Sequence, residues 1–208
     1  MSHQETAEIE ELIQRVIEEG SIASTDTSYS FLCPRIQEGM YIVKSMDSTD
    51  PKDDIFIFLD NLDCTNDFLS TPNRTMQTII DYFDTTKPGY VFVNRREDSS
   101  GRKIVTWGQV VQDRVGQCLE MAIMSQLLFQ RNNHRSFLCG GRSSLDTSGT
   151  HAWNLKKKEG RYFIWDCALG LYAPLDRLEL REGGLDLHPD YEKSIGNKER
   201  IVYRIGGE

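Results

Sequence analysis

The chain has 208 residues, of which 38% are hydrophobic and 27% are charged, and this balance predicts one globular domain spanning residues 1–208. Its 24 Lys and Arg residues against 32 Asp and Glu residues give a net charge of −8, which excludes the basic surface of a nucleic-acid-binding protein. No apolar run approaches the roughly 18 residues of a membrane span, so we expect no membrane insertion.

The N-terminal segment is acidic and amphipathic, unlike a secretory signal. The sequence therefore predicts synthesis in the cytoplasm, and it leaves open delivery into a host cell as a secreted effector. The five cysteines are an odd number and include no Cys-x-x-Cys pair, which argues against a disulfide framework and against a zinc site. We expect neither a metal ion nor another cofactor.

The first half of the chain contains two predicted helices and two predicted strands. Apolar residues at three-and-four spacing predict an amphipathic helix within residues 1–20 and a second helix over residues 76–83. Short continuous apolar runs bounded by polar residues predict buried strands at 55–59 and 90–93. Residues 21–54 are expected to form loops with one or two weak strands, and the remaining residues of the first hundred to form loops.

In the second half, one apolar helix precedes a series of strands, and this order predicts the α+β class. The helix is expected over residues 118–129, and a Gly- and Ser-rich stretch at 140–150 indicates a loop. A Lys-rich segment with Gly160 predicts a tight hairpin turn. The predicted strands are 136–139, 152–156, 162–166 and 200–205.

A cysteine stands at the start of the predicted 118–129 helix, in the segment Gly116-Gln117-Cys118. Unpaired N–H groups and the positive end of the helix dipole favour an anion at this position. The thiolate is the nucleophilic form of cysteine, so Cys118 is a candidate nucleophile. The alternative is an ordinary buried cysteine that only fills space.

A histidine and an aspartate stand on two successive predicted strands. His151 begins the first strand, and Asp166 ends the second, fifteen residues later. Two adjacent antiparallel strands would set the carboxylate of Asp166 beside the imidazole of His151. An acid in that place fixes the tautomer of a histidine that acts as general base and acid. Taken singly, His151 also fits an ordinary structural histidine, and Asp166 also fits a residue that caps the turn at the end of its strand.

These segments together resemble a known superfamily. Gly116-Gln117-Cys118 resembles the nucleophile motif of transglutaminases, His151-Ala152-Trp153-Asn154 resembles their histidine motif, and Trp165-Asp166 resembles the acid segment of the transglutaminase-like, papain-related superfamily. The resemblance covers roughly residues 105–170, which we take as the catalytic core segment, and it is closest in style to compact bacterial glutamine deamidases.

The resemblance implies a papain-like or transglutaminase-like α+β core, in which a catalytic helix packs on an antiparallel sheet. It implies Cys118 as the nucleophile, His151 as the general base and acid, and Asp166 as the residue that orients His151. The tetrahedral intermediate also needs donors. The backbone N–H of Cys118 is one. Upstream, Gln112, Gln109 and Trp107 are candidates for a second, and Gln112 is favoured because papain-like enzymes use a glutamine ahead of the cysteine. Gln117 and Trp153 are further candidates for contacting the oxyanion or the substrate.

The expected function is thiol-dependent acyl transfer on an amide of a protein substrate. Deamidation of a glutamine side chain is favoured, because the Gly-Gln-Cys and His-Ala-Trp-Asn segments resemble those of glutamine-handling members. A cysteine protease and a transglutaminase of the same superfamily are alternatives within the same chemistry. The alternative outside this chemistry is a catalytically silent binding module, which would keep the same fold and use its groove to hold a partner.

Overall fold

The computed structural model describes residues 71–84, 113–132, 136–181, 184–190 and 201–206, with short pieces at 11, 15, 24–25, 28–32, 40–44, 96–97, 103–106 and 134. The predicted N-terminal helix is described only at Glu11 and Arg15, and both are helical. The predicted strands at 55–59 and 90–93 lie outside the described residues.

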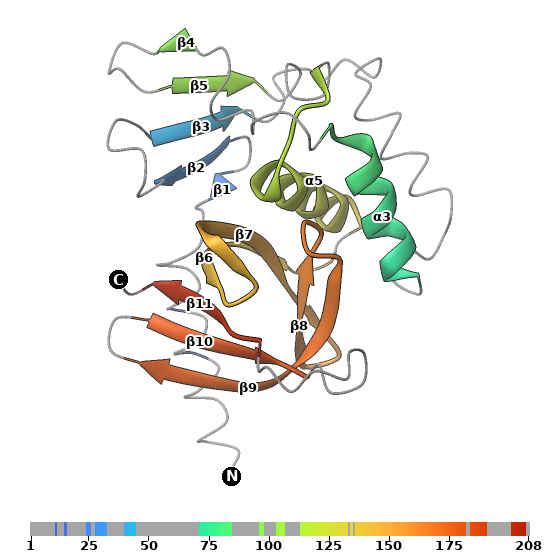
Figure 1. Ribbon diagram of the computed structural model, residues 1–208, viewed down its shortest axis with the longest axis vertical. Coiled ribbons are helices and arrows are strands. Elements are labelled where there is room, and N and C mark those ends of the chain that lie inside the picture. The colour runs from blue at the N-terminus through green and yellow to red at the C-terminus, as the bar shows by residue number, and fades with distance from the viewer. Residues whose placement is uncertain are drawn as a thin grey trace.

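Six strands from the second half of the chain close into an antiparallel barrel, in the order β10-β11-β6-β7-β8-β9 (Figure 1). The barrel closes where β9 pairs with β10, for example Leu180 with Leu185. The strands are β6 (Ser136–Ser143), β7 (Asp146–Lys158), β8 (Arg161–Asp166), β9 (Leu171–Arg181), β10 (Gly184–Pro189) and β11 (Tyr203–Gly206).

This barrel contradicts the expected fold class. We expected a papain-like or transglutaminase-like α+β core with a catalytic helix on an antiparallel sheet, but the described residues are mostly strand and form a closed six-stranded barrel. Only two helices of any length occur in the described part of the chain, α3 (Pro72–Tyr82) and α5 (Cys118–Arg131). The sequence analysis assigns no strand to the residues of β9 and β10 and ends β6 before Gly140, so the predicted sheet lacks the strands with which the barrel closes.

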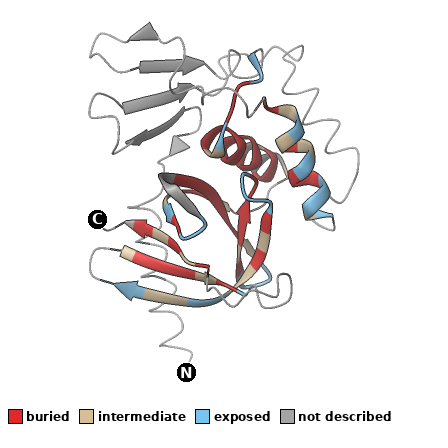
Figure 2. Cartoon of the chain, in the orientation of Figure 1, coloured by how far each residue is buried: buried red, intermediate tan, exposed pale blue. Residues whose placement is uncertain are grey.

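The interior of the barrel is filled by one face of each strand. Side chains alternate across a strand, so every second residue points inward. On β7 and β8 the inward positions are Trp153, Leu155, Tyr162 and Ile164, and they pack with residues of the other four strands. Buried positions accordingly recur along the barrel strands (Figure 2). The remaining members of this cluster are Cys139, Leu171, Ala173, Leu185, Leu187, Ile201, Tyr203 and Ile205.

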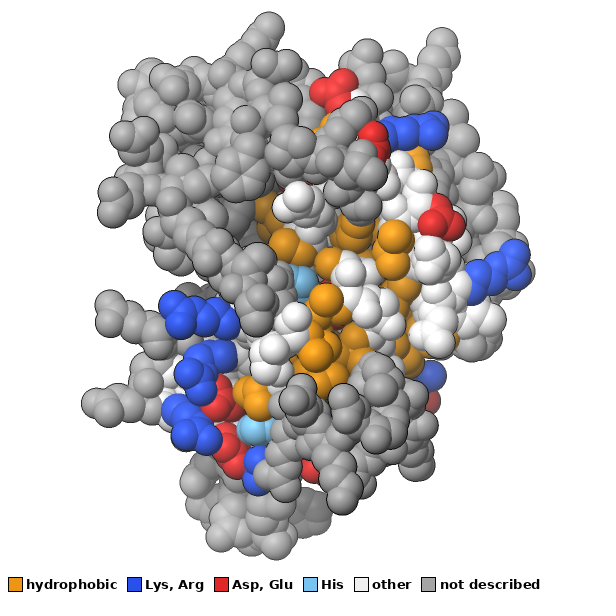
Figure 3. Space-filling model, in the orientation of Figure 1, with side chains coloured by type: hydrophobic (Ala, Val, Ile, Leu, Met, Phe, Trp, Pro, Cys, Tyr) orange, Lys and Arg blue, Asp and Glu red, His pale blue; other side chains and the backbone are white. Residues whose placement is uncertain are grey.

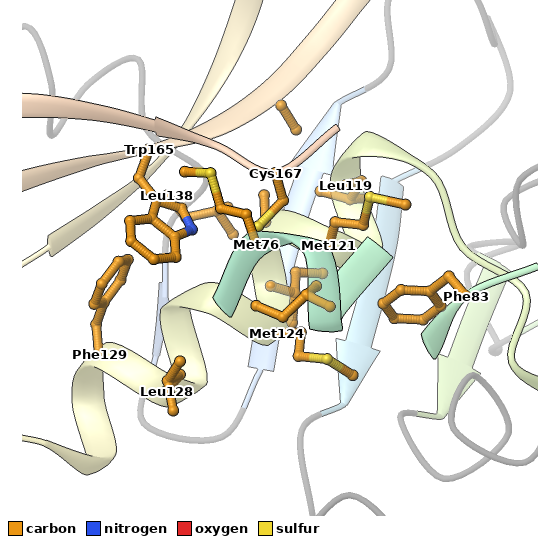
Figure 4. Packing of buried hydrophobic residues seen from close by; sticks show 14 of the residues in the cluster. Met76, Phe83, Leu119, Met121, Met124, Leu128, Phe129, Leu138, Trp165 and Cys167 are labelled. Carbon is orange, nitrogen blue, oxygen red and sulfur yellow. The ribbon is translucent and has the colours of Figure 1, made fainter. Parts of the chain in front are cut away.

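The outward face of β7 and β8 packs against α5, and α3 lies against α5 in turn (Figure 4). Met76 and Ile79 of α3 and Phe83, which follows it, meet the apolar side chains of α5. Helix α5 is buried on almost every side, in keeping with an apolar sequence that leaves no wide polar face. The start of α5 is thereby held against the barrel.

The predicted hairpin turn between β7 and β8 is confirmed. Lys158 pairs with Arg161, and the two residues between them have positive φ, 52° for Glu159 and 79° for Gly160. Two such residues form the tight turn that suits the right-handed twist of antiparallel strands. The turn fixes the register of β7 against β8, and hence the position of His151 relative to Asp166.

A second sheet is described by its backbone, with strand order β1-β2-β3-β5-β4. Strands β3 and β5 run parallel, and the other pairs are antiparallel. The strands are β1 (Ser24–Thr25), β2 (Ser28–Leu32), β3 (Met40–Lys44), β4 (Arg96–Glu97) and β5 (Lys103–Thr106). Among the described residues, no helix has the length and apolarity needed to span a membrane.

Candidate active site

Cys118 is the first residue of α5, as the sequence predicts, and it is partly exposed. The helix begins with one half of a capping box, in which the backbone N–H of Gln117 donates to Oε2 of Glu120 at 2.9 Å. The carbonyl of Gln117 in turn accepts from the N–H of Met121 at 3.0 Å. These bonds fix the backbone on both sides of the thiol.

The segment leading into Cys118 is anchored on the end of α3. A Cβ at Gly116 would lie 2.6 Å from the ring of Phe83 and 2.9 Å from Cβ of Glu120, so only glycine fits this close approach. The backbone N–H of Asp84 donates to the carbonyl of Arg114 at 2.6 Å. Helix α3 therefore supports the loop that carries the nucleophile candidate.

Cys118 differs from the other described cysteines in its environment. Cys139 and Cys167 are buried, whereas Cys118 is partly exposed. Burial raises the pKa of both Cys139 and Cys167 to about 12. Neither of them supplies a thiolate near neutral pH, so Cys118 is the thiol in the described part of the chain that is placed to react.

His151 and Asp166 are in direct contact. Nε2 of His151 lies 2.6 Å from Oδ2 of Asp166, and both side chains are almost completely buried. Asp166 is the last residue of β8, and His151 lies on β7, three residues before the Asn154–Trp165 pair. The juxtaposition predicted from the fifteen-residue spacing is therefore present.

The imidazole of His151 also interacts with the Cys118 side chain. Burial by itself lowers the pKa of His151, but hydrogen bonds and charge interactions with Asp166 and Cys118 outweigh it and raise the pKa to about 10. Nε2 is engaged by Asp166, so an interaction of the ring with the thiol involves Nδ1. Cys118 therefore belongs to the surroundings of an imidazole whose other nitrogen is held by Asp166.

Asp166 is fully buried and accepts hydrogen bonds from three donors. Besides His151, the hydroxyl of Tyr203 donates to Oδ2 at 2.7 Å, and the backbone N–H of Leu169 donates to Oδ1 at 3.1 Å. An ionised carboxylate has enough lone pairs to accept all three at once. Sequence reasoning missed Tyr203, because 37 residues separate it from Asp166 and no local pattern marks it.

Trp153, a predicted substrate-contacting residue, has no exposed surface. Its ring lies inside the barrel, stacked on His151 with ring centroids 6.0 Å apart, and it contacts the ring of Tyr203 at 5.0 Å. The structure therefore places Trp153 behind the imidazole, where it supports the ring, and not on a substrate-accessible surface.

The other two residues predicted to contact the oxyanion or the substrate are Gln117 and Gln112. Gln117 is exposed beside Cys118, but Glu120 already engages its backbone N–H, so only its side-chain amide is directed to solvent. Gln112 lies outside the described residues, and no second oxyanion donor is assigned.

Two residues of the predicted motifs tie α5 to the barrel. The Asn154 amide donates to the carbonyl of Ala122 at 3.0 Å and to Oε1 of Gln126 at 3.1 Å. The indole N–H of Trp165 donates to the hydroxyl of Ser125 at 3.1 Å. These buried bonds fix the helix that begins with Cys118 against the strands that carry His151 and Asp166.

A separate cluster of charged side chains lies on β9, β10 and β11 (Figure 3, lower left). Glu179, Asp186 and His188 bring possible metal ligands within 4.8 Å of one another. Arg204 holds Asp186 through two hydrogen bonds of 2.7 and 3.0 Å and lowers the pKa of its carboxyl, and Arg181 adds an ion pair at 2.9 Å. The arginines already neutralise this cluster, so it is an ion-pair network.

Comparison of the chain with protein-family models, curated proteins and solved structures finds no match.

Proposed function

We propose that this protein is an enzyme that catalyses thiol-dependent acyl transfer on amide substrates. The observation that supports this function is the 2.6 Å distance between Nε2 of His151 and Oδ2 of the buried Asp166, with the partly exposed Cys118 among the groups that raise the pKa of His151. A nucleophile, a base and a residue that orients the base are the three parts that nucleophilic catalysis of acyl transfer requires.

In the first half-reaction, the sulfur of Cys118 attacks the amide carbonyl carbon and a carbon–sulfur bond forms. His151 delivers a proton to the amide nitrogen as the carbon–nitrogen bond breaks, which leaves a thioester on Cys118. In the second half-reaction, His151 removes a proton from water as the water oxygen attacks the thioester. The carbon–sulfur bond breaks, the carboxylic acid leaves, and the Cys118–His151 pair is restored.

We propose glutamine side chains of a protein as the amides and water as the acceptor, so that the products are a glutamate side chain and ammonia. This preference is supported by the resemblance of the Gly116-Gln117-Cys118 and His151-Ala152-Trp153-Asn154 segments to glutamine-handling enzymes. The enzyme would act in the cytoplasm where it is made, or in a host cell after delivery as an effector.

The test is mass spectrometry of casein and of an N-blocked glutaminyl-glycine peptide after incubation with the enzyme. Wild type and Cys139→Ala should convert glutamine to glutamate, and Cys118→Ala should not. Cys139→Ala is the matched control, because it removes a different thiol, which is buried in the barrel cluster and donates to the carbonyl of Phe137. New peptide termini that depend on Cys118 would indicate a protease instead. The proposal fails if Cys118→Ala converts glutamine as fast as wild type.

A further inference from the structure

Tyr203 contacts both the imidazole and the carboxylate of the candidate site. It lies on β11, it has no exposed surface, and its ring centroid is 6.3 Å from that of His151. Its hydroxyl donates to Oδ2 of Asp166 at 2.7 Å, and the same oxygen lies 2.6 Å from Nε2 of His151. One carboxylate oxygen therefore joins the tyrosine to the histidine.

We propose that Tyr203 is a positioning residue, whose hydroxyl holds the Asp166 carboxylate in the orientation that directs His151 toward Cys118. This inference rests on the proposed function, because it gives the tyrosine a role in activating the same thiol.

The carboxylate needs such a restraint. The terminal torsion of an aspartate is broad, so a carboxylate with few partners can rotate about its Cβ–Cγ bond. The Leu169 N–H binds Oδ1 from a turn, and its chain segment is more exposed than the barrel interior. Tyr203 restrains Oδ2, which is the oxygen that binds Nε2 of His151.

Tyr203 is itself held rigidly. Its backbone pairs with Ser143 of β6 on one side and with Leu187 of β10 on the other. Its ring packs against Trp153 at 5.0 Å in the barrel core. Leaving a buried hydroxyl without a partner costs free energy, and this cost favours the hydrogen bond from Tyr203 to Asp166.

The experiment measures the rate at which iodoacetamide alkylates Cys118, by intact-protein mass spectrometry over a range of pH. Tyr203→Phe keeps the ring and removes only the hydroxyl. Tyr162→Phe is the matched control, since Tyr162 is also buried in the barrel cluster but has no contact with Asp166 among the described residues. Circular dichroism checks that each variant is folded.

We expect wild type and Tyr162→Phe to react rapidly at neutral pH, and Tyr203→Phe to react about tenfold more slowly there and to approach them only at high pH. The direction of the change is diagnostic. Removing a donor from Asp166 without moving it would make the carboxylate a stronger partner for the imidazolium, and the thiol would react as fast as before or faster. An unchanged or increased rate in Tyr203→Phe therefore overturns the proposal.

A second variant keeps the test decisive if the phenylalanine variant does not fold. Incorporating 4-aminophenylalanine in place of Tyr203 restores an N–H donor at the same position, and it should recover most of the wild-type rate. A folded protein with this residue and no recovery would overturn the positioning role. Failure of the proposed function would give another result in the same experiment. Iodoacetamide would then alkylate Cys118 of the wild-type protein no faster than Cys33 or Cys64.

Discussion

The side-chain amide of Asn154 on β7 donates a hydrogen bond of 3.0 Å to the backbone carbonyl of Ala122 on α5. Asn154 has no exposed surface, and it lies three residues along the same strand from His151. This bond connects the helix that begins with Cys118 to the strand that carries the imidazole. The relative position of Cys118 and His151 therefore depends on a buried polar contact between α5 and β7.

We expect Asn154→Ala to lower the free energy of unfolding by about 1–3 kcal/mol, because the Ala122 carbonyl and the Gln126 side chain lose a buried donor. Urea denaturation followed by circular dichroism measures this change. Lys158→Ala, an exposed substitution on the same strand, is the control and should leave stability nearly unchanged. Equal stability of the two variants would contradict the role given to Asn154.

Gly116→Ala should destabilise the protein and slow alkylation of Cys118. The new methyl group would lie 2.6 Å from the Phe83 ring, and overpacking of this kind costs about 1–3 kcal/mol. Combining Gly116→Ala with Phe83→Leu should recover part of both losses, because the smaller side chain leaves room for the methyl group. A double-mutant cycle in urea measures the coupling. If the changes in the free energy of unfolding caused by the two substitutions are strictly additive, the Phe83 ring is not what the new methyl group clashes with.

The stability of the protein should depend on the protonation of His151. The folded-state pKa of His151 is raised from 6.5 to about 10, so its contribution is fully present below pH 6.5 and is lost as the pH rises to about 10. We expect the difference in Tm between wild type and His151→Gln to shrink across this range. In Cys118→Ala one of the interactions that raise the folded-state pKa is missing, so the loss should still begin near pH 6.5 but be complete at a lower pH. Parallel Tm curves for wild type and His151→Gln would contradict this linkage.

Lys156→Met should stabilise the protein at neutral pH. Lys156 is fully buried on β7, its Nζ has no hydrogen-bond partner among the described residues, and it lies 5.5 Å from the centroid of the Phe129 ring. Burial lowers its pKa to about 8. A lowered pKa of a base destabilises the fold at low pH, and the cost is relieved as the pH rises from about 8 to 10.5.

Methionine keeps the apolar stem without the charge, so the gain in the free energy of unfolding at pH 7 should be on the order of 2–3 kcal/mol. The gain should disappear toward pH 10.5, the ordinary pKa of lysine. Urea denaturation at pH 7 and at pH 10 checks both expectations. Lys158→Met is the control, because that side chain is exposed on the same strand. Destabilisation by Lys156→Met at pH 7 would mean that the ammonium has a partner that compensates its burial.

The local part of the site could be predicted from the sequence. The apolar helix beginning at Cys118, the tight turn at Gly160 and the contact of His151 with Asp166 all follow from patterns within about twenty residues of one another. Short-range periodicity and turn chemistry determine such features. The helix over residues 76–83 was also correct in kind, although it begins earlier, at Pro72.

The closure of the barrel could not be predicted in this way. Strand β9 carries exposed charged residues in its second half, including Asp176 and Arg177, so its alternation is weak and the sequence predicts no strand there. The sequence predicts a loop at Gly141, but this residue lies in β6, where a Cβ would come within 1.9 Å of the carbonyl oxygen of Arg204. This glycine marks the close approach of two strands and not a turn.

The pairing of Tyr203 with Ser143 joins strands about sixty residues apart in the chain, and loops of that length close slowly compared with hairpins. The restraint on Asp166 can form only after β11 has taken its place between β6 and β10. A partly folded chain then contains Cys118 without an oriented partner. The order of folding itself should therefore delay the activation of the Cys118 thiol by His151 until the barrel is complete.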